Sequence, residues 1–180
     1  MSRKKQTKKQ TGIKLERTLV LLKPDAINRG VVGEILHRFE RIGVKMVGMK
    51  LLVSTKDTAM KHYRQDIAER YGQHIRDLMV NMLTSGPVIA MVWEGVGVIE
   101  VIRKIVGAPY PALAAPGTIR GDFAHVSKDY ANIKGIGVFN LIHASATPEE
   151  AKIEISVWFR SEELVQHYPI YTKFTLREDD

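Results

Sequence analysis

Short apolar runs along this chain are separated by stretches in which apolar residues recur every three or four positions. The first pattern is typical of buried strands and the second of helices with one buried face. Strand-like runs are predicted at 18–22, 44–53, 88–93 and 139–143. Helical spacing is predicted at 31–42, from Asp57 through Tyr63, at 74–83, at 98–106 and from Thr147 onward. The chain therefore mixes strands and helices in alternation.

The order of these elements, β-α-β-α-β-α-β-α, predicts the fold class. Its core is the ferredoxin-like β-α-β-β-α-β arrangement, an α/β (α+β) sandwich whose four-stranded antiparallel sheet is covered by helices. Asp57 is the expected N-cap of its helix, and Thr147, Pro148 and Glu150 form a capping-box start. Loops are predicted at 107–122 and 124–137. No G-x-x-x-x-G-K-[ST] loop occurs, and Glu100 stands where a dinucleotide fingerprint needs its third glycine.

Composition places the chain among ordinary intracellular domains. Its 180 residues are 44% apolar and 26% charged, which is enough for one domain with a real core, predicted over 15–165. Charges interrupt every apolar run, so no membrane span is expected, and a cytoplasmic location is predicted. The absence of cysteine excludes disulfides and thiolate zinc sites.

The net charge of +7 is concentrated in a basic tail over 1–14, and 166–180 is a C-terminal extension. Such a tail usually stays solvated, although weak contact with nucleic acid is an alternative. The tail alone does not predict a nucleic-acid-binding protein.

The most informative stretch is Asn140-Leu141-Ile142-His143-Ala144-Ser145. On a strand, alternate side chains share a face, so His143 and Ser145 should point the same way. Glu154, eleven residues after His143 and within a predicted helix, could fold back onto the imidazole. A histidine oriented by a carboxylate can act as a base, a metal ligand or a covalent nucleophile.

Three cations stand near the ends of predicted elements: Lys23 after the first strand, Arg103 on a helix and Arg120 in a loop. If the four strands share a sheet, these cations could converge near His143. Fixed cations around a histidine suit a transferring phosphoryl group, whose transition state spreads charge over several oxygens. Asn140 could donate an amide hydrogen bond to a phosphate or to a sugar hydroxyl.

Several motifs in order resemble nucleoside diphosphate kinase from about Glu16 to about Leu164. The motifs are Lys23-Pro24-Asp25, Arg29-Gly30, His62-Tyr63, Ser85-Gly86-Pro87-Val88, Met91-Val92-Trp93-Glu94-Gly95, Pro116-Gly117-Thr118-Ile119-Arg120-Gly121-Asp122-Phe123, Asn140-Leu141-Ile142-His143-Ala144-Ser145 and Glu154-Ile155-Ser156-Val157-Trp158-Phe159. The resemblance implies exchange of the γ-phosphoryl group between nucleoside tri- and diphosphates. It also implies homo-oligomers, either tetramers or hexamers, and Mg²⁺ carried on the nucleotide phosphates rather than by the protein.

The same resemblance implies a role for each matched residue. His143 matches the histidine that is phosphorylated in a ping-pong mechanism, Glu154 the carboxylate that holds its ring, and Ser145 the serine beside that pair. Tyr63 matches the tyrosine that helps to position the phosphate and the histidine. The other matches are phosphate and ribose contacts: Lys23, Arg103, Arg120 and Asn140.

Some positions depart from the family pattern. Ala146-Thr147 replaces the usual Asp-Ser pair, and Pro109 stands where the family has a phosphate-binding threonine. The base-stacking phenylalanine has no clear match, with Tyr71 and Ile75 as the alternatives. These departures motivate a second hypothesis, a catalytically weakened family member that acts in regulation or assembly. A third hypothesis is an RNA-binding module on the ferredoxin-like sheet.

Simpler interpretations apply to the other histidines and to the two tryptophans. Of the six histidines only His143 has supporting motifs around it, so the others, including His62, are interpreted as surface or satisfied core residues. Trp93 and Trp158 are interpreted as core or interface residues.

Overall fold

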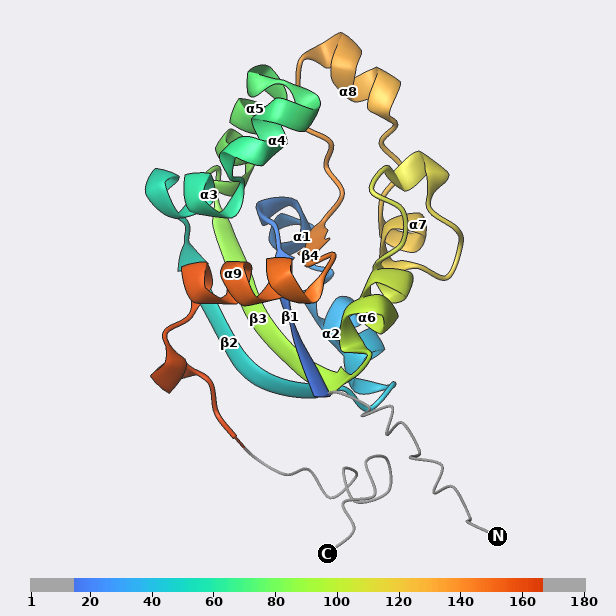
Figure 1. The fold of residues 1–180 in the computed structure, drawn as a ribbon. Coiled ribbons are helices and arrows are strands. Elements are labelled where there is room, and N and C mark those ends of the chain that lie inside the picture. Colours follow the sequence, from blue (N-terminus) through green and yellow to red (C-terminus); the bar gives the residue numbers. More distant parts are fainter. Residues whose placement is uncertain (1–14, 167–180) are drawn as a thin grey trace, which may run out of the picture.

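A curved four-stranded sheet forms the centre of the computed structural model, which describes residues 15–166 (Figure 1). The strands are β1 (Leu15–Leu22), β2 (Lys45–Val53), β3 (Pro87–Val96) and β4 (Ile142–Ala144). They lie in the order β2-β3-β1-β4, and each neighbouring pair is antiparallel. This order confirms the predicted ferredoxin-like arrangement. The predicted basic tail, and the C-terminal extension apart from residue 166, lie outside the described residues.

Helices fill the connections between the strands. None of those within 15–166 has the length and apolar character that crossing a bilayer requires. Their bounds are α1 (Pro24–Asn28), α2 (Val32–Glu40), α3 (Lys56–His62), α4 (Gln65–Tyr71), α5 (Gln73–Leu83), α6 (Val98–Val106), α7 (Ile119–Phe123), α8 (Lys128–Lys134) and α9 (Pro148–Trp158), with short 3-10 turns at Pro111–Leu113 and Ser161–Glu163.

Alternation along β1 divides the interior into two cores. Val20 and Leu22 pack on one face of the sheet with apolar residues of α2 and α6, such as Phe39 and Ile102. Leu19 and Leu21 pack on the other face with residues of α3, α5 and α9. Figure 1 shows α9 crossing in front of the sheet and α2 behind it. Because residues 19–22 of β1 are buried on both faces of the sheet, this part of the strand is apolar throughout instead of alternating with polar residues.

The fourth strand is shorter than predicted and begins later. The sequence predicts 139–143, whereas β4 covers Ile142–Ala144. The cause is Leu141, a non-glycine residue with a φ of 69°, which turns the backbone immediately before the strand. Its N–H donates to Asp25 Oδ2 at 2.9 Å, and its carbonyl accepts from the Lys23 N–H at 2.8 Å. These two bonds offset the strain of the left-handed conformation.

Two stretches predicted as loops contain helices. Helix α7 lies within 107–122 and extends to Phe123, and α8 lies within 124–137. Thr118 and Ser127 cap them by accepting backbone N–H bonds through their hydroxyls, at 3.1 Å in each case. Both helices are short and have little apolar periodicity, which is why the sequence pattern predicts loops there. Their cap residues are the main feature of the sequence that indicates helices.

The structure also corrects the predicted helix starts. Thr55, not Asp57, caps α3, because its hydroxyl accepts from the Thr58 N–H at 3.1 Å. In α9, Thr147 accepts from the Glu150 N–H as predicted. The Glu150 carboxylate, however, accepts from the N–H of Ala146 instead of returning to Thr147. The predicted capping box is therefore only half formed.

Candidate active site

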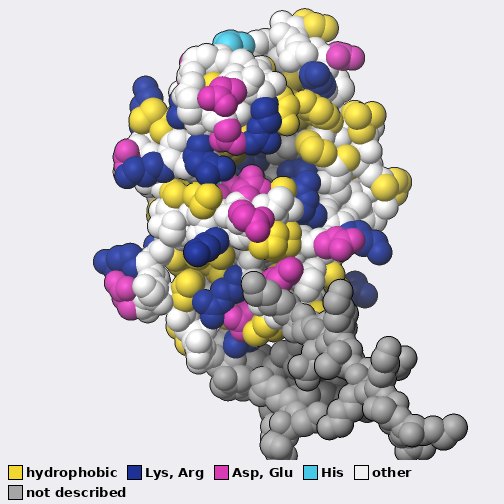
Figure 2. Space-filling model, in the orientation of Figure 1, with side chains coloured by type: hydrophobic (Ala, Val, Ile, Leu, Met, Phe, Trp, Pro, Cys, Tyr) yellow, Lys and Arg dark blue, Asp and Glu magenta, His cyan; other side chains and the backbone are white. Residues whose placement is uncertain are grey.

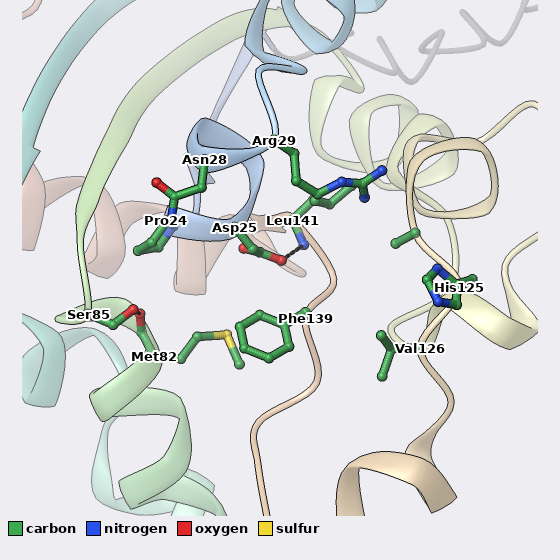
Figure 3. Close-up of a pocket in the computed structure, with 11 residues that line it drawn as sticks. Pro24, Asp25, Asn28, Arg29, Met82, Ser85, His125, Val126, Phe139 and Leu141 are labelled. Atoms are coloured by element: carbon green, nitrogen blue, oxygen red, sulfur yellow. Dashed lines mark hydrogen bonds between the residues drawn. The ribbon is translucent and has the colours of Figure 1, made fainter.

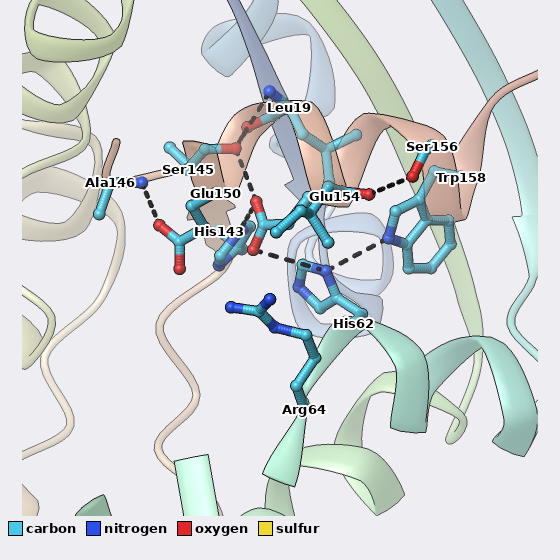
Figure 4. A network of polar contacts seen from close by, with 12 residues as sticks. Leu19, His62, Arg64, His143, Ser145, Ala146, Glu150, Glu154, Ser156 and Trp158 are labelled. Atoms are coloured by element: carbon cyan, nitrogen blue, oxygen red, sulfur yellow. Dashed lines mark hydrogen bonds and ion pairs between the residues drawn. The ribbon is translucent and has the colours of Figure 1, made fainter. Parts of the chain in front are cut away.

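His143 lies in the middle of β4, opposite Leu21 of β1. Its Nε2 is 2.9 Å from Glu154 Oε2, which reaches it from the buried side of α9 (Figure 4). The histidine side chain is 21% exposed and the glutamate side chain only 7%. The carboxylate therefore fixes the ring from inside while part of the ring faces solvent.

Ser145 completes this arrangement from the residue after β4. Its hydroxyl donates to the same Glu154 oxygen at 2.6 Å and accepts from the Leu19 N–H at 3.3 Å. Burial is the largest influence on the Glu154 carboxyl and opposes its ionisation. The contacts with His143 and Ser145 together outweigh it, so the pKa of Glu154 lies below its ordinary value. Glu154 is thus a carboxylate, an acceptor for both neighbours.

Lys23 and Asn140 meet at the end of β1. The Lys23 ammonium donates to Asn140 Oδ1, and the Asn140 amide donates to the carbonyl of Pro109 at 2.7 Å. Burial lowers the pKa of Lys23 to about 8. Pro109 lacks a hydroxyl, but its carbonyl ties the loop after α6 to the asparagine. The ammonium group is therefore held in place, and it loses its proton more readily than an ordinary lysine does.

The two arginines that the sequence predicts for this site are both anchored to backbone carbonyls. Arg120 donates to Gly107 at 2.9 Å, to Ile142 at 2.6 Å and to Asn140 at 3.3 Å. Arg103 donates to Ala144 at 3.3 Å. Burial, and then the neighbouring Arg103, lower the pKa of Arg120 to about 10. Both cations thus stand beside β4 even though they come from different helices.

Figure 2 shows Lys and Arg side chains on both sides of a depression above α9, the helix that carries Glu154. Positive charge on the two sides of a cleft favours the approach of an anion, and Figure 2 also shows Asp and Glu side chains at the lower edge of this one.

Tyr63 is buried beside His62, with their ring centroids 4.7 Å apart. Burial, and then the Glu154 carboxylate, raise the pKa of Tyr63 above its ordinary value, so its hydroxyl stays protonated. All the site residues that the sequence predicts are therefore grouped around His143 and the loops that border it.

His62 is a core residue, as one of its two interpretations predicts, but it is not fully satisfied within the described residues. His62 is buried, and its ring meets that of His143 edge-on with the centroids 4.5 Å apart. Its Nδ1 accepts from the Trp158 indole N–H at 3.3 Å, while its Nε2 has no hydrogen-bond partner within the described residues. Its place next to Tyr63 in the motif was the available signal. The interpretation of Trp93 and Trp158 as core residues is confirmed by their burial.

A cavity of about 430 Å³ lies next to this site, lined by residues that include Pro24, Asp25, Met82 and Phe139 (Figure 3). Leu141 forms part of its wall and separates it from β4. None of the predicted site residues lines it. The cavity is therefore a neighbour of the site and not the site itself.

His62, His143 and Glu154 offer three ligand atoms within 4.8 Å of one another. Part of the cluster is already committed, because Glu154 Oε2 accepts from His143 and Ser145, and His62 Nδ1 accepts from Trp158. Two of the three are imidazole nitrogens, whereas Mg²⁺ requires oxygen ligands. The cluster therefore does not fit Mg²⁺.

A helix-covered antiparallel sheet that presents a histidine–carboxylate pair among fixed cations suits a phosphotransferase. The family model for nucleoside diphosphate kinase matches residues 16–164. The chain therefore belongs to the nucleoside diphosphate kinase family. It is an enzyme that transfers a phosphoryl group between nucleotides, and enzymes of this kind generally use a divalent metal.

Individual proteins of this family are similar to the chain over most of its length. A nucleoside diphosphate kinase of Borreliella burgdorferi is 44% identical over 154 residues, which cover 85% of this chain and 92% of that protein. Nucleoside diphosphate kinase III of Arabidopsis thaliana, chloroplastic/mitochondrial, is 48% identical over 85% of this chain and 58% of its own length.

Two solved structures share the fold. One is a transition state mimic of the Borrelia burgdorferi enzyme with bound vanadate and ADP. It has a TM-score of 0.88 and 41% identity, and the match covers 90% of this chain and 97% of that one. The other is an NDP kinase from Pyrobaculum aerophilum, with a TM-score of 0.79 and 37% identity over 85% of this chain and all of that one.

Proposed function

We propose that the enzyme exchanges the γ-phosphoryl group between nucleoside triphosphates and diphosphates through a phosphohistidine at His143. The 2.9 Å contact between His143 Nε2 and the ionised Glu154 carries this proposal. The carboxylate keeps the proton on Nε2, which leaves a lone pair on Nδ1 for attack. Ser145 steadies the carboxylate from its other side.

The reaction divides into two balanced steps. Nδ1 of His143 attacks the γ-phosphorus of the triphosphate, a P–N bond forms, and the P–O bond to the departing diphosphate breaks. A terminal oxygen of a second diphosphate then attacks the same phosphorus, and the P–N bond breaks to restore the neutral ring. Because the phosphoryl group waits on the histidine, the two nucleotides bind one after the other. A direct transfer would need both nucleotides bound at once.

The cations and neutral donors of the site suit the charge on the phosphates. Lys23, Arg103 and Arg120 supply positive charge near β4, and Asn140 supplies an amide to phosphate or ribose. The protonated hydroxyl of Tyr63 can donate to a phosphoryl oxygen without adding charge. The anchoring of Arg103, Arg120 and Asn140 to backbone carbonyls reduces the reorganisation that nucleotide binding requires.

Mg²⁺ is the proposed metal. It would neutralise charge on the phosphates and orient them, and it would be carried mainly by phosphate oxygens. The cluster of His62, His143 and Glu154 suits hard, oxygen-seeking cations poorly, so these residues would not themselves hold the ion.

The direct test is incubation of the purified protein with γ-labelled ATP and Mg²⁺, followed by addition of GDP or CDP. An acid-labile phosphoenzyme that the diphosphate discharges is expected. Absence of label, or a label that no diphosphate removes, would contradict the mechanism and favour a member that only binds nucleotide.

We also propose that the enzyme is a homo-oligomer, a tetramer or a hexamer. Strand β2 is an edge of the sheet, and three of its apolar side chains are exposed: Met49, Leu51 and Val53, at 46%, 66% and 67%. An apolar edge strand of this kind is a surface that natural proteins cover. Native mass spectrometry gives the number of subunits, and Leu51→Lys should reduce it. A monomeric wild-type protein would contradict the proposal.

We propose a cytoplasmic location, where nucleoside di- and triphosphates are made and used. The Arabidopsis thaliana relative is named as chloroplastic/mitochondrial, so the compartment varies among similar proteins. Fractionation of the source cells tests the location.

A further inference from the structure

Arg64 lies between Tyr63 and the first residue of α4, at a firmly held point of the backbone. Arg76 of α5 donates to the carbonyl of Tyr63 at 2.7 Å and to that of Met60 at 3.3 Å, which fixes the α3–α4 connection. Figure 4 shows the Arg64 side chain directed from this connection into the space beside His143 and His62. A cation outside the predicted set therefore faces the proposed nucleophile.

The Arg64 guanidinium has unused hydrogen-bonding capacity. Among the described residues its ion pair is that of Nε with Asp66 Oδ1, and the distance of 3.7 Å is too long for a hydrogen bond. The other oxygen of Asp66 pairs with Arg70 instead. Arg120, in contrast, spends all three of its nitrogens on carbonyl oxygens. Arg64 is 45% exposed and can donate to an incoming anion without breaking a protein hydrogen bond.

A second, independent observation points to an anion in the same space. Because the Trp158 N–H donates to His62 Nδ1, the proton of the neutral His62 ring is on Nε2. This buried N–H has no acceptor within residues 15–166, and such groups are rare in native proteins. The ring lies edge-on to His143, and Figure 4 shows the nitrogen away from Trp158 on the side where Arg64 lies. A donor without an acceptor and a cation without a close partner thus face one space.

We propose that Arg64 binds an oxygen of the terminal phosphoryl group of a nucleoside triphosphate as that group is transferred to His143. The proposal rests on His143 being the nucleophile. A guanidinium can contact two oxygens of one phosphoryl group and is charged at every pH at which the enzyme works. It adds positive charge from the α3–α4 side, opposite the cations that border β4. Arg64 is therefore a substrate-binding residue for the known reaction.

Rapid-quench measurement of phosphohistidine formation from γ-labelled ATP and Mg²⁺ tests this role. Arg64→Gln should lower the second-order rate constant for phosphorylation by about tenfold to a hundredfold, the usual effect of a lost charge-assisted bond. Arg64→Lys should recover part of the loss. Lys61→Gln is the matched control, because it removes one charge from an exposed pair with Asp57 on the neighbouring helix α3. Adenosine affinity should be equal in all four proteins, since adenosine has no phosphates.

The outcomes separate this inference from the proposed function. If the wild-type protein forms phosphohistidine and Arg64→Gln behaves like Lys61→Gln, the role of Arg64 is wrong while the ping-pong mechanism stands. If Arg64→Gln weakens adenosine as much as ATP, the residue shapes the cleft and does not bind the phosphoryl group. If the wild-type protein forms no phosphohistidine, the mechanism itself fails.

Discussion

The two sides of the site are built differently. On the histidine side, side chains bond to side chains: His143 and Ser145 share one oxygen of Glu154, and Trp158 donates to His62. On the cation side, the arginines bond mainly to backbone carbonyls, as Arg120 does with Gly107 and Ile142. The first arrangement fixes the direction of one imidazole ring. The second places positive charge along loops and leaves the site open to phosphates.

This difference predicts different kinetic consequences. A change on the histidine side should alter the chemical step and therefore kcat, because it changes the aim or basicity of the nucleophile. A change on the cation side should alter the affinity for nucleotide and therefore KM, to the extent that ground state and transition state are bound alike.

The largest effect is expected for His143→Ala. Removal of the covalent nucleophile should lower kcat on the order of 10⁶-fold, as in enzymes that lose such a group. The fold should persist, because the side chain is partly exposed at a short strand and contributes little to either core. Exchange assays and thermal unfolding measure the two effects. His37→Ala on α2 is the control, and turnover retained in His143→Ala would exclude the mechanism.

Glu154→Gln should have the next largest effect. An amide keeps the shape of the side chain but has no negative charge, and it can turn its NH₂ group toward His143, so the proton is no longer held on Nε2. We expect kcat to fall about 10- to 100-fold, the usual effect of losing a group that orients a functional histidine, with little change in KM. Glu149→Gln, on the exposed first turn of α9, should leave both constants unchanged. A rise in KM with an unchanged kcat would contradict this prediction, because it would mean that Glu154 acts on nucleotide binding as the cation side does.

The two sides also differ in how well the sequence predicts them. Alternation on a strand and the motif around His143 place Ser145 and Glu154 beside it, and the structure brings them together. His62 was missed because its contacts come from Trp158, far along the chain, and tertiary packing has no local pattern. The early start predicted for β4 has a similar cause. The apolar run continues through Leu141, whereas the left-handed turn there depends on Asp25.

Lys23 provides a test on the cation side that needs no substitution. Because its pKa is lowered to about 8, its ammonium is charged below that pH and becomes neutral above it. The affinity for ADP should therefore be constant at lower pH and fall by up to about tenfold per pH unit above 8. Calorimetric titration from pH 6 to 10 measures it, with adenosine as the control that should not respond. An ADP affinity that stays flat through this range would show that Lys23 does not bind phosphate.

The smallest effect is expected at Pro109. Its carbonyl accepts from the Asn140 amide at 2.7 Å, a bond that any residue at this position can keep. Pro109→Thr would add a hydroxyl near the phosphates and should lower KM by a few-fold, roughly the value of one hydrogen bond. Pro109→Val has nearly the shape of threonine without its hydroxyl, so it separates the new contact from the effect of losing proline. If the two variants share one KM, or if threonine raises it, the loop binds nucleotide through its backbone alone.

Because the hydroxyl would act on binding, kcat should stay constant in both variants. A change in kcat would mean that the loop also positions Asn140 for the transfer, and the division between the two sides would fail at this residue.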